Sequence, residues 1–95
     1  MKKLVQSSQY KRDLKRIRNN PKKAIALFEI LKKLENEIPI PPENKAHMLS
    51  GDFAGCMECH IEGDFLLIWI DSHTDEIVLV RLGSHSELFG KGKKR

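Results

Sequence analysis

The 95-residue sequence has few aromatic residues and no apolar run long enough to cross a membrane. Residues 7–11 are mostly polar, where a secretory signal peptide would be apolar. We therefore expect a cytoplasmic protein in a reducing compartment, without membrane contact. Because aromatic residues are only 6% of the chain, aliphatic side chains must form most of the core of one small domain.

Charge is divided unevenly along the chain, although the net charge is only +4. Residues 1–33 carry 11 basic and 2 acidic side chains, whereas residues 34–90 carry 2 basic and 11 acidic ones. The last five residues add four more basic side chains. A basic half of this kind indicates a polyanion or an acidic protein as partner, and the alternative is an ordinary solvated helix face.

The N-terminal part predicts a short strand at residues 3–6 and then two helices that form a helical hairpin. The first helix is expected over residues 9–18 with Ser7 as a capping residue, and the second over residues 21–36 with Asn20 as its N-cap. The apolar positions of the two helices are Tyr10, Leu14 and Ile17, and Ala24, Leu27, Phe28, Leu31 and Leu34.

The C-terminal part predicts three strands. Residues 56–62 alternate between apolar and polar side chains, residues 65–70 form an almost continuous apolar run, and residues 77–82 follow a polar turn. Residues 86–89 suit a short helical turn. The expected fold is a single α+β domain through residue 90, in which the helical hairpin packs on a mostly antiparallel sheet built around this three-stranded meander, with residues 91–95 as a flexible basic tail.

The histidines all lie in the sheet half of the sequence, at His47, His60, His73 and His85. His60 shares a strand face with Glu58, and Asp64 follows in the next turn. Arg81 and His85 are four residues apart, so both side chains face one site if their strand persists through the intervening glycine.

Histidine, carboxylate and arginine together suit the cleavage of a phosphodiester bond. An imidazole can remove the proton of a ribose 2′-hydroxyl near neutral pH, and a second acid can protonate the leaving 5′-oxygen. Arginine can stabilise the charge that builds on the phosphate oxygens. This chemistry requires no metal and no cofactor, and we expect neither. A surface histidine with no catalytic role is the alternative at each position.

Residues 56–60 match the C-x-x-C-H pattern by which c-type haem is attached. The alternating pattern argues against haem, because a strand places Cys56 and Cys59 on opposite faces, where they also cannot form a disulfide. A zinc site would need more ligands than His47 or His60 supply. We therefore expect Cys59 to be a small core residue and Cys56 an incidental surface residue.

The segment from residue 47 to residue 89 carries a series of spaced polar motifs. They are His47-Met48-Leu49-Ser50-Gly51, Gly55, Glu58-Cys59-His60-Ile61-Glu62, Asp64, Leu66-Leu67-Ile68-Trp69, and Arg81-Leu82-Gly83-Ser84-His85-Ser86-Glu87-Leu88-Phe89. In these motifs the sequence resembles the YafQ branch of the RelE/ParE toxin superfamily. The N-terminal half agrees less specifically, and the resemblance covers nearly the whole chain apart from the tail.

The resemblance implies a RelE-like fold and a toxin of a type II toxin–antitoxin pair, which enters the ribosomal A site and cuts mRNA there. It implies an acidic antitoxin of the RelB or DinJ kind as a partner, besides the ribosome and mRNA. The alternative within the superfamily is a ParE-like toxin that acts on DNA gyrase. The matched functional positions are His47, His60, Asp64 and His85 as catalytic residues, and Glu58, Arg81 and Phe89 as substrate contacts.

Roles follow for these residues as expectations. We expect His60 and His85 to share the acid–base work, with Asp64 orienting one imidazole. His47 and Arg81 would hold the phosphate. Phe89 would stack on an mRNA base or, alternatively, close the end of the sheet.

The sequence departs from the family pattern at two positions: Met57 lies where many relatives have arginine, and Gly63 replaces a frequent proline and should loosen the turn before Asp64.

The first helix carries like charges four residues apart, at Lys11 and Lys15 and at Arg12 and Arg16. Each such pair destabilises a helix by roughly 0.2–0.5 kcal/mol. Retention of two pairs favours a role for these four side chains in binding ribosomal RNA. The acidic sheet half would repel free RNA, which is consistent with an enzyme that cuts only mRNA held by a ribosome.

Overall fold

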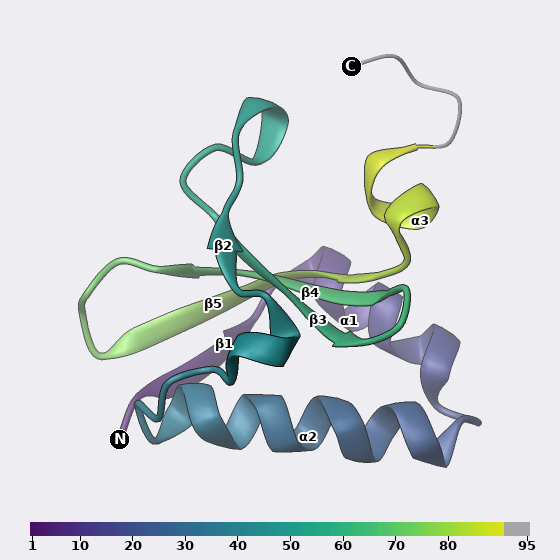
Figure 1. Cartoon of the computed structure of the whole chain (residues 1–95), viewed down its shortest axis with the longest axis horizontal. Helices are drawn as coiled ribbons and strands as arrows, with labels where there is room; N and C mark the ends of the chain where they lie inside the picture. The colour runs from purple at the N-terminus through teal and green to yellow at the C-terminus, as the bar shows by residue number, and fades with distance from the viewer. Residues whose placement is uncertain (91–95) are drawn as a thin grey trace.

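The computed structural model describes residues 1–90 and has the predicted α+β architecture (Figure 1). In chain order the elements are β1 (Lys3–Gln6), α1 (Ser8–Leu14), the 3-10 turn η1 (Lys15–Ile17), α2 (Pro21–Glu35), η2 (Pro42–Asn44), β2 (His47–Met48), η3 (Gly51–Phe53), β3 (Met57–Glu62), β4 (Phe65–Asp71), β5 (Glu76–Gly83) and α3 (His85–Phe89). Within this range no helix has the length and apolarity to span a bilayer. The predicted tail at residues 91–95 lies outside the described residues.

The strands form one sheet in the order β1-β5-β4-β3-β2. The predicted meander is confirmed, since β3, β4 and β5 pair antiparallel. The N-terminal strand joins its edge parallel to β5, with Lys3 opposite Glu76. The far edge is β2, which the sequence did not predict because a two-residue strand is too short to show alternation. It pairs antiparallel with β3, where His47 lies opposite Glu58.

Local sequence signals set the two N-terminal helices. The Ser7 side chain accepts a hydrogen bond from the Tyr10 N–H at 3.0 Å and caps α1. The Asn20 side chain accepts one from the Lys23 N–H at 3.2 Å and caps α2. The first helix is shorter than predicted, because the chain tightens into a 3-10 turn after Leu14 and ends at Ile17.

The buried face of α2 differs from the predicted one at three positions, because Ala24 and Phe28 are exposed and Ile30 is buried. Leu27, Ile30 and Leu34 face the sheet, at the three- and four-residue spacing of one helical stripe. Phe28 lies one step around the helix and is 58% exposed, so its predicted place in the core was wrong. Its ring lies 5.4 Å from the Lys32 ammonium, an exposed cation–π contact.

The sheet has an apolar cluster on each face. The larger one packs Phe65, Leu67 and Trp69 of β4 against α1 and α2, and the smaller one contains Leu66 and Ile68 from the other face. Strand β4 is therefore buried on both sides, as its apolar run predicts. The smaller cluster lies on the face from which α3 and the β2–β3 connection rise, away from α2 (Figure 1).

The two cysteines belong to different clusters. Cys59 is completely buried in the larger cluster, and Cys56 is 6% exposed in the smaller one. Their separation is the one predicted from strand geometry, and it does not suit thioether attachment of a haem. The expectation that Cys56 lies on the surface was wrong, because the smaller cluster covers it. Burial, with a smaller contribution from the charge of Glu58, raises the pKa of the Cys59 thiol to about 12.

Candidate active site

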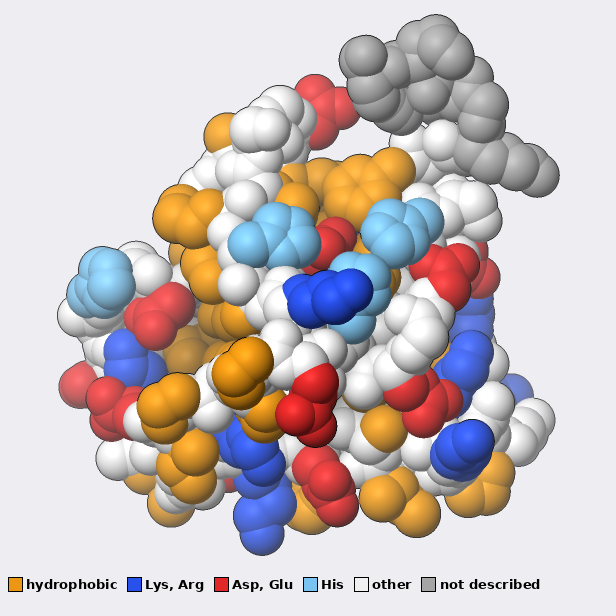
Figure 2. All heavy atoms as spheres, in the orientation of Figure 1, with side chains coloured by type: hydrophobic (Ala, Val, Ile, Leu, Met, Phe, Trp, Pro, Cys, Tyr) orange, Lys and Arg blue, Asp and Glu red, His pale blue; other side chains and the backbone are white. Residues whose placement is uncertain are grey.

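Three of the four histidines gather on the sheet face opposite α2 (Figure 2). Cys59 and Ile61 of β3 point into the larger cluster. Because side chains alternate along a strand, Glu58 and His60 point to the other face of the sheet. His47 reaches the same place from β2, and His85 from α3. The pale blue side chains near the centre of Figure 2 mark this group, which we call the histidine cluster.

His85 is delivered by the N-terminus of α3 rather than by a strand. Ser84 and Glu87 form a capping box, in which each side chain accepts a hydrogen bond from the other residue's backbone N–H. A Cβ atom at Gly83 would lie 2.7 Å from the Glu87 Oε1, so glycine leaves room for the capping carboxylate. Strand β5 ends at Gly83, so the alternation that would place Arg81 and His85 on one face does not extend to His85.

Asp64 holds His85 in place from the β3–β4 turn. Its Oδ1 accepts hydrogen bonds from the His85 backbone N–H at 2.9 Å and from the His85 Nδ1 at 2.7 Å. These bonds, first from the backbone and then from the ring, hold the pKa of the Asp64 carboxyl below its ordinary value of 3.8. An ionised Asp64 accepts a hydrogen bond from the Nδ1–H of His85. Nε2 is therefore the ring nitrogen of His85 that remains available for proton transfer in catalysis.

The ring of His60 lies beside that of His85, with 5.6 Å between centroids and 61° between planes. The His60 Nδ1 lies 3.4 Å from the carbonyl oxygen of Gly63, which can only accept a hydrogen bond. His60 therefore has the same arrangement as His85: an anchored Nδ1 and an available Nε2. Two imidazoles in this relation can serve as a base and an acid in one reaction.

His47 and Glu58 form the third part of the cluster. The His47 Nδ1 lies 2.8 Å from the Lys45 carbonyl oxygen and must donate to it, because a carbonyl has no proton to give. The His47 Nε2 lies 3.3 Å from the Glu58 Oε1, and that contact requires another proton on one of the two groups. Glu58 is only 3% exposed, so this contact gives its buried carboxyl group a hydrogen-bonding partner.

Two aromatic rings extend the cluster. Phe89, at the end of α3, lies 6.0 Å from the His85 ring at an angle of 33°. Phe53, from η3, meets Phe89 edge to face at 5.7 Å. Both rings are partly exposed and pack against the smaller apolar cluster. Sequence reasoning missed Phe53, because it lies in an irregular connection that has no periodic pattern.

Arg81 is held by Asp13. Its Nε and Nη2 bond to the Asp13 carboxylate at 2.8 and 3.2 Å, a partner that the four-residue spacing to His85 did not indicate. Asp13 is 1% exposed and was missed by the sequence reasoning. A signal was present, because Asp13 is three residues from Tyr10 and so shares the apolar face of the first helix.

The four basic residues of the first helix and η1, Lys11, Arg12, Lys15 and Arg16, are all exposed. They lie on the segment that packs along β5, the strand on which α3 also packs. Arg16 also forms ion pairs with Asp13 and Glu87 at 3.5 and 3.7 Å. The first helix therefore carries positive charge next to the element that holds His85.

A family model, "Bacterial toxin of type II toxin-antitoxin system, YafQ", matches residues 2–90 of the chain. The chain belongs to the YafQ family of type II toxins. Escherichia coli K12 has a relative, "mRNA interferase toxin YafQ", that is 34% identical over 86 residues, which are 88% of this chain and 91% of that protein.

Two solved structures extend the comparison. A copper-bound mutant toxin from Helicobacter pylori is 35% identical, with a TM-score of 0.84 over 94% of this chain and 100% of that one. The YafQ structure in an Escherichia coli DinJ–YafQ complex is 29% identical, with a TM-score of 0.80 over 95% of this chain and 100% of that one. The YafQ fold is thus shared over the full described length.

In this YafQ-family chain the histidine cluster also has the composition of a metal site. One ligand atom from each of Glu58, His60 and His85 lies within 4.8 Å of the others. Imidazole nitrogens and a carboxylate oxygen suit zinc and copper, and three protein ligands leave an open position. The residues therefore fit a transition-metal ion, although the predicted chemistry uses none.

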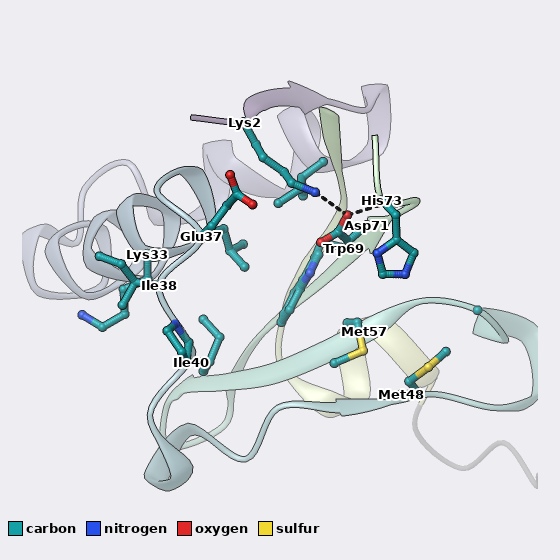
Figure 3. Close-up of a pocket in the computed structure, with 14 residues that line it drawn as sticks. Lys2, Lys33, Glu37, Ile38, Ile40, Met48, Met57, Trp69, Asp71 and His73 are labelled. Atoms are coloured by element: carbon teal, nitrogen blue, oxygen red, sulfur yellow. Dashed lines mark hydrogen bonds and ion pairs between the residues drawn. The ribbon is translucent and has the colours of Figure 1, made fainter. Parts of the chain in front are cut away.

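A separate cavity of about 520 Å³ lies between the end of α2 and the β3–β4 part of the sheet (Figure 3). Trp69 and Met57 line its apolar wall, and the Lys2 ammonium bonds to Asp71 at 3.0 Å on its rim. The fourth histidine, His73, belongs to this rim. His73 is not part of the histidine cluster, and we do not count it among the candidate catalytic residues.

Proposed function

We propose that this type II toxin is a ribosome-dependent endoribonuclease that cleaves mRNA in the A site by metal-independent acid–base catalysis. The observation that carries the proposal is the His60–His85 pair, in which both Nδ1 atoms are anchored and Asp64 fixes one ring. The mRNA interferase name of the Escherichia coli relative supports it. Retention of the three clustered histidines favours this function over a ParE-like action on gyrase.

The reaction needs two proton transfers. One imidazole of the pair takes the proton from a ribose 2′-hydroxyl, and the 2′-oxygen attacks the adjacent phosphorus. The bond from phosphorus to the 5′-oxygen breaks, and the other imidazole, as imidazolium, gives its proton to that oxygen. The products are a 2′,3′-cyclic phosphate, which can open to a 3′-phosphate, and a 5′-hydroxyl.

The remaining residues bind substrate in this proposal. His47, held between the Lys45 carbonyl and Glu58, binds the phosphate. Arg81 has Nη1 left for the phosphate, because Asp13 uses its other two nitrogens. Phe89 stacks on a base of the mRNA, a contact worth roughly 1–3 kcal/mol.

The partners follow from charge. Lys11, Arg12, Lys15 and Arg16 bind ribosomal RNA, since each neutralises phosphate charge. The acidic antitoxin covers part of the same basic surface and blocks the histidine cluster, with complementary charge speeding the encounter. YafQ in the DinJ complex is a related precedent. A ribosome-bound toxin of this kind acts in the cytoplasm, which is the location we propose.

End-group analysis of the cleaved mRNA tests the mechanism. We expect a cyclic or 3′-phosphate and a 5′-hydroxyl, with cleavage unaffected by a transition-metal chelator at constant magnesium concentration. A 5′-phosphate product, or cleavage abolished by the chelator, would contradict acid–base chemistry at the histidine pair. Arrest of DNA replication without mRNA cleavage would favour the ParE-like alternative.

A second candidate function is metal-dependent inhibition. Glu58, His60 and His85 are placed to bind a copper or zinc ion, and a related toxin has been crystallised with copper. A bound ion would occupy imidazole nitrogens that catalysis needs, so it would block cleavage. Calorimetry with copper should show binding that His60→Gln weakens and His73→Gln preserves. Equal binding by both variants would exclude the cluster as the site.

A further inference from the structure

Asp13 is a buried carboxylate that the proposed reaction does not use. It is 1% exposed, and it accepts hydrogen bonds from the Arg81 Nε at 2.8 Å, the Arg81 Nη2 at 3.2 Å and the Leu82 backbone N–H at 2.9 Å. A buried ion pair contributes little net stability compared with apolar residues of the same size, because both charges lose their hydration. The position of this pair is therefore the informative feature.

Asp13 provides a hydrogen-bond acceptor at the end of β5, on the edge where no neighbouring strand is paired. Pairing between β1 and β5 stops at Gln6 opposite Leu79, so the rest of that β5 edge has no strand beside it. The Ser7 hydroxyl donates to the Val80 carbonyl oxygen at 2.9 Å, and the Asp13 carboxylate takes the Leu82 N–H. Side chains of the first helix and its cap thus form the hydrogen bonds that a neighbouring strand would otherwise make with this edge of β5.

The same end of β5 is irregular. The register with β4 shifts between Ile68 and Trp69, where Val80 is the extra residue on β5. Only two residues separate Leu82 from His85, so the direction in which β5 leaves the sheet sets where α3 begins. Asp13 fixes that direction by bonds to two consecutive residues.

A second connection joins the first helix to α3. The Arg16 Nη1 lies 3.5 Å from the Asp13 carboxylate and 3.7 Å from the Glu87 carboxylate. Glu87 accepts the Ser84 N–H at 2.8 Å and so closes the capping box that places His85. Arg16 therefore lies between a carboxylate of α1 and a carboxylate of α3.

We propose that Asp13 is a positioning residue for the ribonuclease reaction: it fixes the end of β5 from which His85 is delivered, and through Arg16 it joins α3 to the basic first helix. The inference rests on the proposed function. Asp13 touches no reacting atom and acts through Leu82, Arg81 and Arg16. Contacts of the first helix with ribosomal RNA are thereby connected to the placement of the catalytic histidine.

Asp13→Asn tests this role in single-turnover cleavage of mRNA on ribosomes. The asparagine keeps the shape but removes the charge that holds Arg81 and Arg16. The saturating rate constant should fall roughly 10- to 100-fold, because small displacements of catalytic groups have effects of that size. The toxin concentration at half saturation should change less than the rate constant does, since Lys11, Arg12 and Lys15 keep their proposed contacts with ribosomal RNA in this variant.

Leu27→Ala is the matched control, because it destabilises the packing of α2, which lies mainly on β3, and it removes none of the hydrogen bonds at the end of β5. It should leave the saturating rate constant of the folded protein unchanged. Asp13→Glu keeps the charge and the fold but displaces the carboxylate, so its rate should also fall. The proposal is overturned if a folded Asp13 variant cleaves at the wild-type rate, or if Leu27→Ala loses rate equally. A wild-type protein that does not cleave at all contradicts the proposed function itself.

Discussion

Asp64 and His85 are joined twice through one atom: the Asp64 Oδ1 accepts both the backbone N–H and the ring Nδ1 of His85. The backbone bond fixes where α3 begins, and the ring bond fixes the tautomer and direction of the imidazole. Both groups are more than half exposed at the side chain, so the pair is open to a substrate. Its contribution to function is orientation.

Asp64→Asn should therefore reduce cleavage while the protein stays folded. An amide has one acceptor oxygen and a donor nitrogen, so it no longer favours the Nδ1–H tautomer by charge. We expect the saturating rate to fall on the order of 10-fold or more, since general acid–base contributions are of that size or larger. Primer extension on ribosome-bound mRNA measures the rate, with Asp52→Asn as an exposed aspartate control. A wild-type rate would remove Asp64 from the mechanism.

The Lys2–Asp71 pair predicts how stability depends on pH. The His73 N–H and the Lys2 ammonium hold the pKa of the Asp71 carboxyl below its ordinary value of 3.8. Its stabilising effect is therefore present above pH 3.8 and is lost as the pH falls through the lower folded-state pKa. Asp71→Asn should cost up to about 1 kcal/mol at pH 7, the range for ion pairs near the protein surface. Urea unfolding should show that difference shrink as the pH is lowered from 7 to below 3.8, and a difference that stays constant over this range would contradict the assignment.

The basic first helix should contribute affinity for the ribosome. Changing Lys11, Arg12, Lys15 and Arg16 to glutamine should weaken binding and reduce the slope of log K against log salt by roughly 0.7–0.9 for each phosphate that is no longer neutralised. Binding rather than rate is the measurement, because Arg16 also contacts Glu87. The control changes Lys3, Lys22, Lys32 and Lys33 to glutamine, which removes the same amount of charge. Equal effects from both variants would mean that general charge, not this helix, is responsible.

Both thiols should be unreactive in the native protein. Cys59 is fully buried with a pKa of about 12, and burial also raises the pKa of Cys56. Only the thiolate reacts with a disulfide reagent, so native protein at pH 8 should react far more slowly than free cysteine. Denaturant should release both thiols. Rapid reaction of the native protein would contradict the packing of the two apolar clusters.

Local signals predicted most of the secondary structure. The caps at Ser7 and Asn20 depend on neighbouring residues only, and the β4 run depends on burial on both faces, so each is visible in a short window of sequence. Phe28 was misplaced because helical periodicity alone does not decide which of two adjacent apolar positions faces the sheet. That choice depends on tertiary packing.

The candidate site was predicted in composition but not in geometry. The family motif identified His60, Asp64 and His85, and the structure places all three together. It did not indicate that His85 begins a helix, although the Ser84–Glu87 capping box is a local signal for that helix start. Nor did it indicate that Arg81 pairs with Asp13, because these two residues are 68 positions apart in the chain. Such long-range pairings leave no periodic pattern in a single sequence.

The sharpest test of the proposed mechanism is cleavage by His85→Ala. Purified ribosomes carrying a defined mRNA are mixed with wild-type toxin, His85→Ala or the control His73→Ala, whose histidine lies at the separate cavity. Primer extension gives the cleavage rate, and co-sedimentation gives ribosome binding. We predict a rate loss on the order of 10²-fold or more for His85→Ala, with binding retained and His73→Ala fully active. Wild-type cleavage by a folded, ribosome-bound His85→Ala protein would contradict the mechanism.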